Sequence, residues 1–165
     1  MILVHRRKEH ESLELRFDSV YLVVALELVD QGEFSLYASE EDMRDAILIE
    51  PSLVEEGFRP ATIERPVPSG FIDVLGVDKE GRLTVIEIKR VTAGRNAVAQ
   101  LKRYVDDLRQ STGQQVRGIL AGPEISRGVQ ALLATLKLEY RLISVKKCAE
   151  ILGNRRERKI TEFPS

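Results

Sequence analysis

The feature that most constrains the fold is a pair of apolar runs within residues 70–89, separated by a short glycine-containing loop at residues 78–82. This pattern predicts a β-hairpin. Side chains alternate across a strand, so pairing around that loop places Asp73 directly opposite Glu87, with Lys89 on the same face as Glu87. Like charges at facing positions of two strands destabilise the pair unless a positive charge lies between them. The hairpin therefore predicts a bound cation within an otherwise apolar sheet.

A divalent metal is the cation that fits these ligands. The carboxylates of Asp73 and Glu87, an exposed backbone carbonyl at Ile88 and water molecules make an all-oxygen site, which suits Mg²⁺ or Mn²⁺ and does not suit zinc. Such a metal binds a phosphoryl oxygen and acidifies a bound water, while the Lys89 ammonium can orient that water or neutralise charge on the phosphate. The alternative is an exposed strand pair with an ordinary Glu–Lys ion pair. The motif Glu-x-Lys alone is weakly specific, because it also occurs at residues 157–159, where no strand surrounds it.

Composition narrows the class of protein. The 165 residues are 43% hydrophobic and 31% charged, which predicts one globular domain with room for a small appendage. The net charge is −1, so attraction to nucleic acid has to come from a local basic patch. A single cysteine, Cys148, and the lack of a signal peptide or a long apolar run favour a cytoplasmic protein without membrane contact. His5 and His10 lie in a charged stretch with no third ligand at a usable spacing, which favours a solvated loop over a metal site.

Helix and strand signals alternate along the chain. Before the hairpin we expect strands at residues 13–17 and 34–37, a strand or short helix at 20–28, a helix capped by Ser39 that ends before Pro51, a helical turn at 51–56 and a proline-bounded edge strand at 62–65. After it we expect a helix at residues 96–111, a strand at 116–121, a helix at 126–137, a strand at 138–143 and a short helix at 145–152 that ends at Gly153. This order predicts an α/β domain whose mixed sheet is covered on both faces by helices.

The helix at residues 96–111 carries a polar pair and a basic surface. Gln100 and Tyr104 are four residues apart and share one face of the helix. Basic residues on and just before this helix lie beside the predicted metal, which favours contact with DNA phosphates over a solvated face. These residues are Arg90, Arg95, Lys102, Arg103 and Arg109. Asp45, on the preceding helix, is either a solubilising residue or part of the site.

Three motifs in combination resemble the PD-(D/E)xK nuclease superfamily and its RecB-like members. They are Gly70-Phe71-Ile72-Asp73, Glu87-Ile88-Lys89 and Gln100-x-x-x-Tyr104. Residues 39–143 are similar to the nuclease domain of the EndoMS family of archaeal and actinobacterial mismatch endonucleases, also called NucS. The resemblance implies a restriction-endonuclease-like fold and a metal-dependent DNA endonuclease that hydrolyses phosphodiester bonds in DNA repair.

The resemblance also implies roles for individual residues. Asp73, Glu87 and the Ile88 carbonyl would hold Mg²⁺, for which Mn²⁺ can substitute. Lys89 would act on the attacking water. Gln100 and Tyr104 would support the phosphate or the water, and Asp45 stands where related nucleases carry a glutamate on a helix, which makes it a further candidate ligand.

Three segments follow from the same resemblance. Residues 1–38 look like the last strands and linker of the family's N-terminal DNA-binding domain, residues 39–152 form the nuclease domain, and residues 153–165 form a flexible basic tail. Because the sequence does not match the full recognition domain, we do not expect this chain alone to select mismatches, and we expect a compact nuclease that relies on a partner for targeting, with a homodimer as one option. A nuclease acting on branched or single-stranded DNA, and a non-catalytic module that binds DNA or a sliding clamp, remain as alternatives.

The tail holds two apolar residues, Ile160 and Phe163, in a polar context. They are three residues apart, so one helical turn would place both on one face. This arrangement resembles the C-terminal clamp-binding peptide of archaeal replication and repair proteins. The alternative is a disordered tail that binds nothing.

Overall fold

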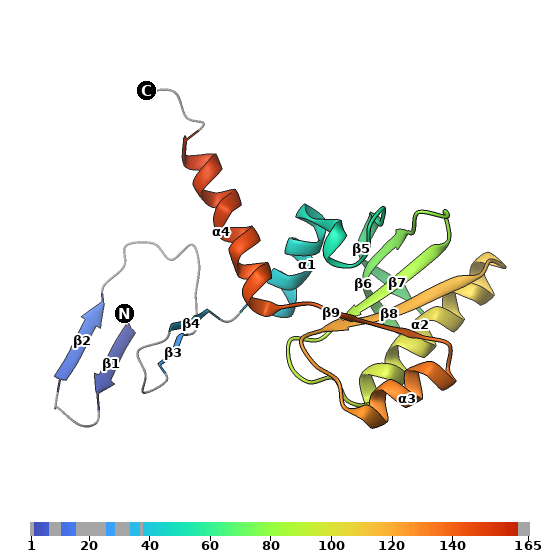
Figure 1. Cartoon of the computed structure of the whole chain (residues 1–165), viewed down its shortest axis with the longest axis horizontal. Coiled ribbons are helices and arrows are strands. Elements are labelled where there is room, and N and C mark those ends of the chain that lie inside the picture. Colours follow the sequence, from blue (N-terminus) through green and yellow to red (C-terminus); the bar gives the residue numbers. More distant parts are fainter. Residues whose placement is uncertain (1, 7–10, 16–25, 29–33, 37, 162–165) are drawn as a thin grey trace.

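The computed structural model describes the whole chain except residues 1, 7–10, 16–25, 29–33, 37 and 162–165 (Figure 1). Its main element is a five-stranded mixed sheet whose strands lie in sequence order: β5 (Arg59–Val67), β6 (Gly70–Val77), β7 (Leu83–Ile88), β8 (Val116–Gly122) and β9 (Glu139–Leu142). The helices of the described part are α1 (Glu40–Ile49), the 3₁₀ turn η1 (Pro51–Leu53), α2 (Arg95–Thr112), α3 (Arg127–Thr135) and α4 (Val145–Thr161). The predicted α/β class is thereby confirmed.

Short strands in the first 36 residues form two antiparallel pairs. β1 (Ile2–Arg6) pairs with β2 (Glu11–Leu15), and β3 (Leu26–Leu28) pairs with β4 (Phe34–Leu36). The strands expected at residues 13–17 and 34–37 are confirmed in their described parts. The segment at residues 20–28, for which a strand or a helix was open, is a strand over its last three residues.

The strand pairing in the main sheet changes from antiparallel to parallel at β7. β5, β6 and β7 are antiparallel neighbours, whereas β7, β8 and β9 run parallel. Parallel neighbours need a crossover, and helices α2 and α3 provide the two that the sequence predicts. β5 is the expected edge strand. It carries Pro60 and Pro66, which have no backbone N–H to donate and are therefore tolerated only at the edge of a sheet.

Side-chain caps set the starts of two helices. The Ser39 hydroxyl accepts a hydrogen bond from the Asp42 backbone N–H, and the Asp42 carboxylate accepts one from the Ser39 backbone N–H. This reciprocal pair stabilises the first turn of α1, where acidic side chains also match the helix dipole. Ser126 caps α3 through the Val129 N–H. Among the residues that the structure describes, none of the helices is long and apolar enough to span a bilayer.

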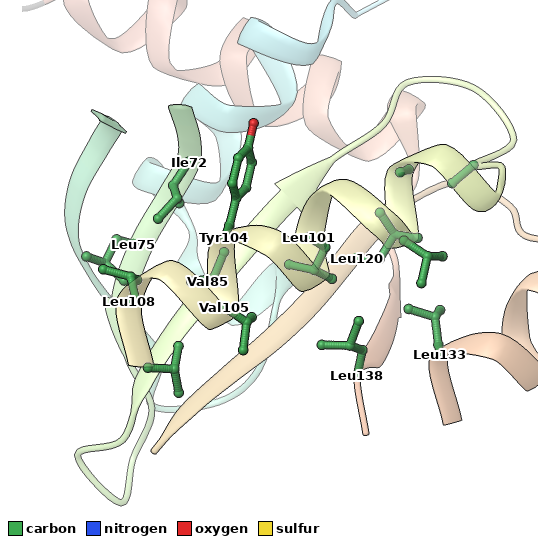
Figure 2. Packing of buried hydrophobic residues seen from close by; sticks show 14 of the residues in the cluster. Ile72, Leu75, Val85, Leu101, Tyr104, Val105, Leu108, Leu120, Leu133 and Leu138 are labelled. Carbon is green, nitrogen blue, oxygen red and sulfur yellow. The ribbon is translucent and has the colours of Figure 1, made fainter. Parts of the chain in front are cut away.

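One hydrophobic core lies on each face of the sheet. Helices α2 and α3 cover the first face, and Figure 2 shows their side chains packed on those of the strands. This core includes Leu75, Val85, Leu101, Val105, Leu108, Leu120, Leu133 and Leu138. Helices α1 and α4 cover the other face, with Met43, Ile47, Val74, Ile86, Ile88, Ile119, Cys148 and Ile151 in the second core. The sheet is therefore packed between helices on both of its faces, which holds its strands in place.

A polar network ties the hairpin loop to its neighbours. Arg117 of β8 donates to Glu55 and Asp78 and makes a two-pronged contact with Glu139 of β9. Asp78 also accepts from Arg82, through both backbone and side chain, and is fully buried. Burial opposes its ionisation, but the hydrogen bonds from Arg82 and Arg117 outweigh burial and hold the pKa of Asp78 at about 2.

The prediction that the last helix ends at Gly153 is wrong. Helix α4 continues through this residue to Thr161, so residues 153–161, expected to form a flexible tail, are helical. A glycine costs a helix interior only about 1 kcal/mol. Cys148 and Ile151, which are 0% and 7% exposed, anchor the first turns of α4 in the core shared with α1. The helix is therefore already nucleated when it reaches the glycine.

We predict that Arg117→Met destabilises the protein, because three carboxylates lose their shared cation and buried Asp78 loses one of its donors. The free energy of unfolding should fall by about 1–3 kcal/mol in urea titrations. Arg103→Met, at an exposed position of α2, is the control and should stay within about 0.5 kcal/mol of the parent. Equal stability of the two variants would contradict a supporting role for the network.

Candidate active site

The strands of the hairpin separate where the predicted carboxylates lie. The register places Val77 opposite Leu83 and Leu75 opposite Val85, as predicted, and the ladder ends with the next pair, Val74 and Ile86. Asp73 follows beyond that point. Its Oδ2 accepts a hydrogen bond from the Ile88 N–H at 2.7 Å, so a side chain takes the place of a strand carbonyl. The ladder hydrogen bonds of β6 and β7 therefore stop beside Glu87.

Glu87 is a buried carboxylate without hydrogen bonds. The residue is 1% exposed, and neither of its carboxylate oxygens has a hydrogen-bond partner. The Lys89 Nζ lies 2.7 Å from Oε1, which is an ion-pair distance without the geometry of an oriented hydrogen bond. A buried charge with a single partner is costly, and in native proteins such a group commonly has a functional role.

The pKa values of this group shift together. Burial and then the neighbouring charge of Asp73 raise the pKa of Glu87 to about 7, although Lys89 opposes the shift. Burial also raises the pKa of Asp73, against the Ile88 N–H and the Lys89 charge. Burial lowers the pKa of Lys89, but its contact with Glu87 outweighs burial, so the net shift is upward. Asp73 and Glu87 resist being ionised at the same time. The single positive charge of Lys89 does not balance two carboxylates, so the site can accept a further cation.

The residues present fit a hard divalent cation. Two adjacent carboxylates with unused oxygens are typical ligands of Mg²⁺, which completes its coordination with water and substrate phosphate. Within the described residues, no group of three or more His, Cys, Asp and Glu side chains is close enough to hold a metal ion. Asp73 and Glu87 could hold such an ion only together with water and substrate oxygens. Ile88 is 0% exposed and its side chain packs in the core, so its carbonyl is not open to solvent, and the role of this carbonyl as a metal ligand stays a prediction.

Glu40 is the acidic residue of α1 that approaches the pair. Its Oε2 lies 3.8 Å from Lys89 Nζ, and its Oε1 accepts from the Arg90 N–H at 3.1 Å. Its charge also contributes to the raised pKa values of Asp73 and Glu87. Sequence reasoning selected Asp45 on this helix, whose half-exposed carboxylate lies 3.9 Å from the Arg44 guanidinium. The three acidic residues in the first turn of α1 are the sequence signal that could have pointed to Glu40.

Gln100 and Tyr104 are brought together as predicted. The Gln100 side-chain amide donates to the Tyr104 hydroxyl at 2.8 Å. Tyr104 is 3% exposed, and Figure 2 shows its ring among core side chains with the hydroxyl at the edge of the cluster. Gly70 makes room for this hydroxyl, because a Cβ at Gly70 would lie 2.7 Å from it and the φ of +144° is unfavourable for other residues.

The turn before β6 is bound to α2 at the same place. The Asp107 carboxylate accepts hydrogen bonds from both the backbone N–H and the hydroxyl of Ser69. Because these bonds lie one residue from Gly70, they fix the turn over the Tyr104 hydroxyl. The first residues of β6 are thereby held against the helix that carries Gln100 and Tyr104.

The basic surface of α2 is partly neutralised. Lys102 pairs with both carboxylate oxygens of Asp106, and Arg109 donates to the Val116 carbonyl while lying 3.9 Å from Asp106. Arg90, Arg95 and Arg103 are exposed. All five residues lie on or just before α2, as expected, and contact with DNA stays a prediction for each. Of the two residues of the predicted clamp peptide, Ile160 belongs to α4 and Phe163 lies outside the described residues.

Sequence comparison points to one family. Residues 39–163 match the family model described as the Endonuclease NucS C-terminal domain. Endonuclease NucS of Pyrococcus horikoshii is 41% identical over 146 residues, which make up 88% of this chain and 58% of that protein. The chain thus spans little more than half the length of this relative.

Solved structures show the same fold. A structure of EndoMS in complex with double-stranded DNA matches with a TM-score of 0.63 and 39% identity, over 86% of this chain and 59% of that chain. A repair endonuclease from Pyrococcus abyssi matches with a TM-score of 0.62 and 30% identity, over 86% of this chain and 73% of that chain.

We predict that the metal-free protein loses stability as the pH rises from 4.5 to about 7. The folded pKa of Glu87 is raised from 4.5 to about 7, so in this interval the folded protein holds a proton that the unfolded chain releases. The stabilising contribution is complete below the unfolded pKa and is lost as the pH rises through the folded one. Melting temperatures in EDTA should therefore fall with rising pH. Glu87→Gln should flatten this slope, and an unchanged slope in that variant would refute the assignment.

Proposed function

This chain belongs to the NucS endonuclease family, and on that premise we propose that it is a DNA endonuclease that uses Mg²⁺, or Mn²⁺ in its place, to hydrolyse phosphodiester bonds in DNA repair. The single observation that carries the proposal is the buried Glu87 carboxylate beside Asp73, with unused oxygens and a pKa raised to about 7. Such a pair suits a divalent metal, and two buried carboxylates that share the single cation of Lys89 are costly to a fold that has no use for them.

The proposed chemistry divides between the metal and three side chains. Asp73 and Glu87 would hold the metal, which would act as a Lewis acid toward a phosphoryl oxygen and would lower the pKa of a water molecule. Lys89 stays protonated because its pKa is raised, so its contribution is to orient the attacking water or to stabilise negative charge on the phosphate, and not to remove a proton.

Gln100 and Tyr104 serve as supports in this proposal. Their mutual hydrogen bond fixes both side chains at the edge of the core, near the first residues of β6. A preorganised amide and hydroxyl can donate to a phosphate or to a water without reorganising during the reaction. Glu40 orients Lys89 from the side of α1.

DNA is the proposed substrate, because the chain resembles an EndoMS that was solved with double-stranded DNA. Arg90, Arg95 and Arg103 are the exposed basic residues proposed to contact its phosphates. A homodimer, a sliding clamp bound through the C-terminal segment and a cytoplasmic location belong to the same proposal. The alternative of a non-catalytic DNA- or clamp-binding module has less support, since such a module has no need of the buried pair.

Cleavage tests the proposal directly. The purified chain should nick plasmid DNA in Mg²⁺ or Mn²⁺, and EDTA should abolish the reaction. Lys89→Ala should keep calorimetric Mn²⁺ binding yet cleave about 100- to 1,000-fold more slowly, because it removes transition-state stabilisation and no ligand. Lys79→Ala, at an exposed loop position, is the control and should cleave at the parental rate. Cleavage that persists in EDTA would exclude the metal mechanism.

Glu40 and Asp45, two of the acidic residues of α1, offer a matched pair of variants. Glu40→Gln should lower the cleavage rate by about 10- to 100-fold, since it removes the partner that orients Lys89. Asp45→Asn, on the same helix and with the same change of charge, should cleave like the parent. The opposite ranking in single-turnover assays would return the role to Asp45.

A further inference from the structure

Phe71 is a large aromatic side chain left in solvent beside the proposed active site. It is 64% exposed, whereas the next residue, Ile72, is fully buried. Among the described residues, Phe71 is in neither hydrophobic core nor among the partly buried side chains that pack on them. A single exposed apolar residue is common on protein surfaces, so its meaning depends on its position and its rigidity.

The position of Phe71 matches the spacing of a nucleic acid strand. Phe71 precedes Asp73 by two residues on β6, which corresponds to about 6.7 Å along a strand. Successive bases of one DNA strand are separated by about 3.4 Å along the helix axis. A phosphate bound at Asp73 and Glu87 would therefore place the base one or two nucleotides away within reach of the Phe71 ring.

The backbone of Phe71 is held on both sides. Across the ladder it pairs with Pro66 of the edge strand. On its N-terminal side, Gly70 lies against the Tyr104 hydroxyl, and the adjacent turn is bound to α2 through Ser69 and Asp107. An aromatic ring on a fixed backbone loses little conformational entropy when it binds a flat ligand.

We propose that Phe71 stacks on an unpaired base of the DNA strand that is cut, one or two nucleotides from the scissile phosphate. This inference rests on the proposed nuclease function. A phenyl ring has no hydrogen-bonding group, so it accepts any base through its π-face and reads no sequence. A paired base inside a duplex is already covered on both faces by its neighbours. The Phe71 ring, the stacking platform, therefore selects DNA with a free base, such as a single strand, a duplex end or an extruded mispaired base.

Fluorescence can detect this stacking, because the chain contains no tryptophan. Phe71→Trp, combined with Glu87→Gln to prevent cleavage, introduces a single reporter at the platform. The control is Leu142→Trp in the same background, since Leu142 is 67% exposed on β9, at the other edge of the sheet from β5. Binding is followed by the anisotropy of a dye-labelled single strand, mismatched duplex or fully paired duplex, and stacking by the tryptophan emission.

The proposal predicts quenching of Phe71→Trp by the single strand or the mismatched duplex, and no quenching of Leu142→Trp. Phe71→Ala, with Glu87 intact, should bind the same strands about 5- to 140-fold more weakly, which is a stacking free energy of about 1–3 kcal/mol at about 1.4 kcal/mol per tenfold. Its affinity for the paired duplex and its melting temperature should stay close to those of the parent.

Different results would overturn different claims. If the parent binds DNA and nicks it in Mg²⁺, but Phe71→Trp is not quenched and Phe71→Ala binds like the parent, the stacking role is wrong while the nuclease function stands. Equal quenching by the paired duplex would refute the selection of an unpaired base. A Phe71→Ala variant that changes only the oligomeric state would assign the ring to contact with a second copy. Failure of the parent to bind or cut any DNA would overturn both claims.

Discussion

The close approach of two carboxylates, Asp73 and Glu87, is the interaction on which the rest of the site depends. Two negative charges that lie close together repel each other, and burial leaves less water to screen that repulsion. Burial is the largest cause of the raised pKa of both groups, and the charge of Asp73 raises the pKa of Glu87 further. A cation bound between the two carboxylates is attracted by both of them and removes their repulsion.

The fold keeps the carboxylates together by fixing what surrounds them. Ile72 and Val74 flank Asp73, Ile86 and Ile88 flank Glu87, and all four are fully buried. The strands cannot move apart without exposing these side chains, each of which stabilises the fold by about 1.5–3 kcal/mol when buried. At the far end of the hairpin, the Arg117 network binds the loop to its neighbours. Repulsion at one end of the hairpin is thus balanced by packing and by ion pairs elsewhere.

Sequence reasoning predicted the parts that depend on local pattern. The hairpin register, the edge strand with its prolines and the crossover helices follow from periodicity and turn chemistry, and the structure confirms them. It did not predict the divergence of the strands at Asp73, because side-chain alternation assumes that the ladder continues. It also named Asp45 and not Glu40 on α1, because spacing along the helix does not show that Glu40 lies 3.8 Å from Lys89, and the role of Asp45 stays a prediction. The helix beyond Gly153 was missed because its early turns are stabilised by tertiary contacts with α1. Each error lies where a distant contact outweighs a local rule.

The most direct test of this account is the titration of the Glu87 carboxyl carbon by NMR, in the presence and absence of Mg²⁺. Without metal, the account predicts a midpoint at about pH 7, because burial and the charge of Asp73 both disfavour ionisation. With saturating Mg²⁺, the midpoint should move below its ordinary value near 4.5, because the cation favours the carboxylate. A midpoint near 4.5 in the metal-free protein that Mg²⁺ does not change would contradict the claim that these two carboxylates form a metal site.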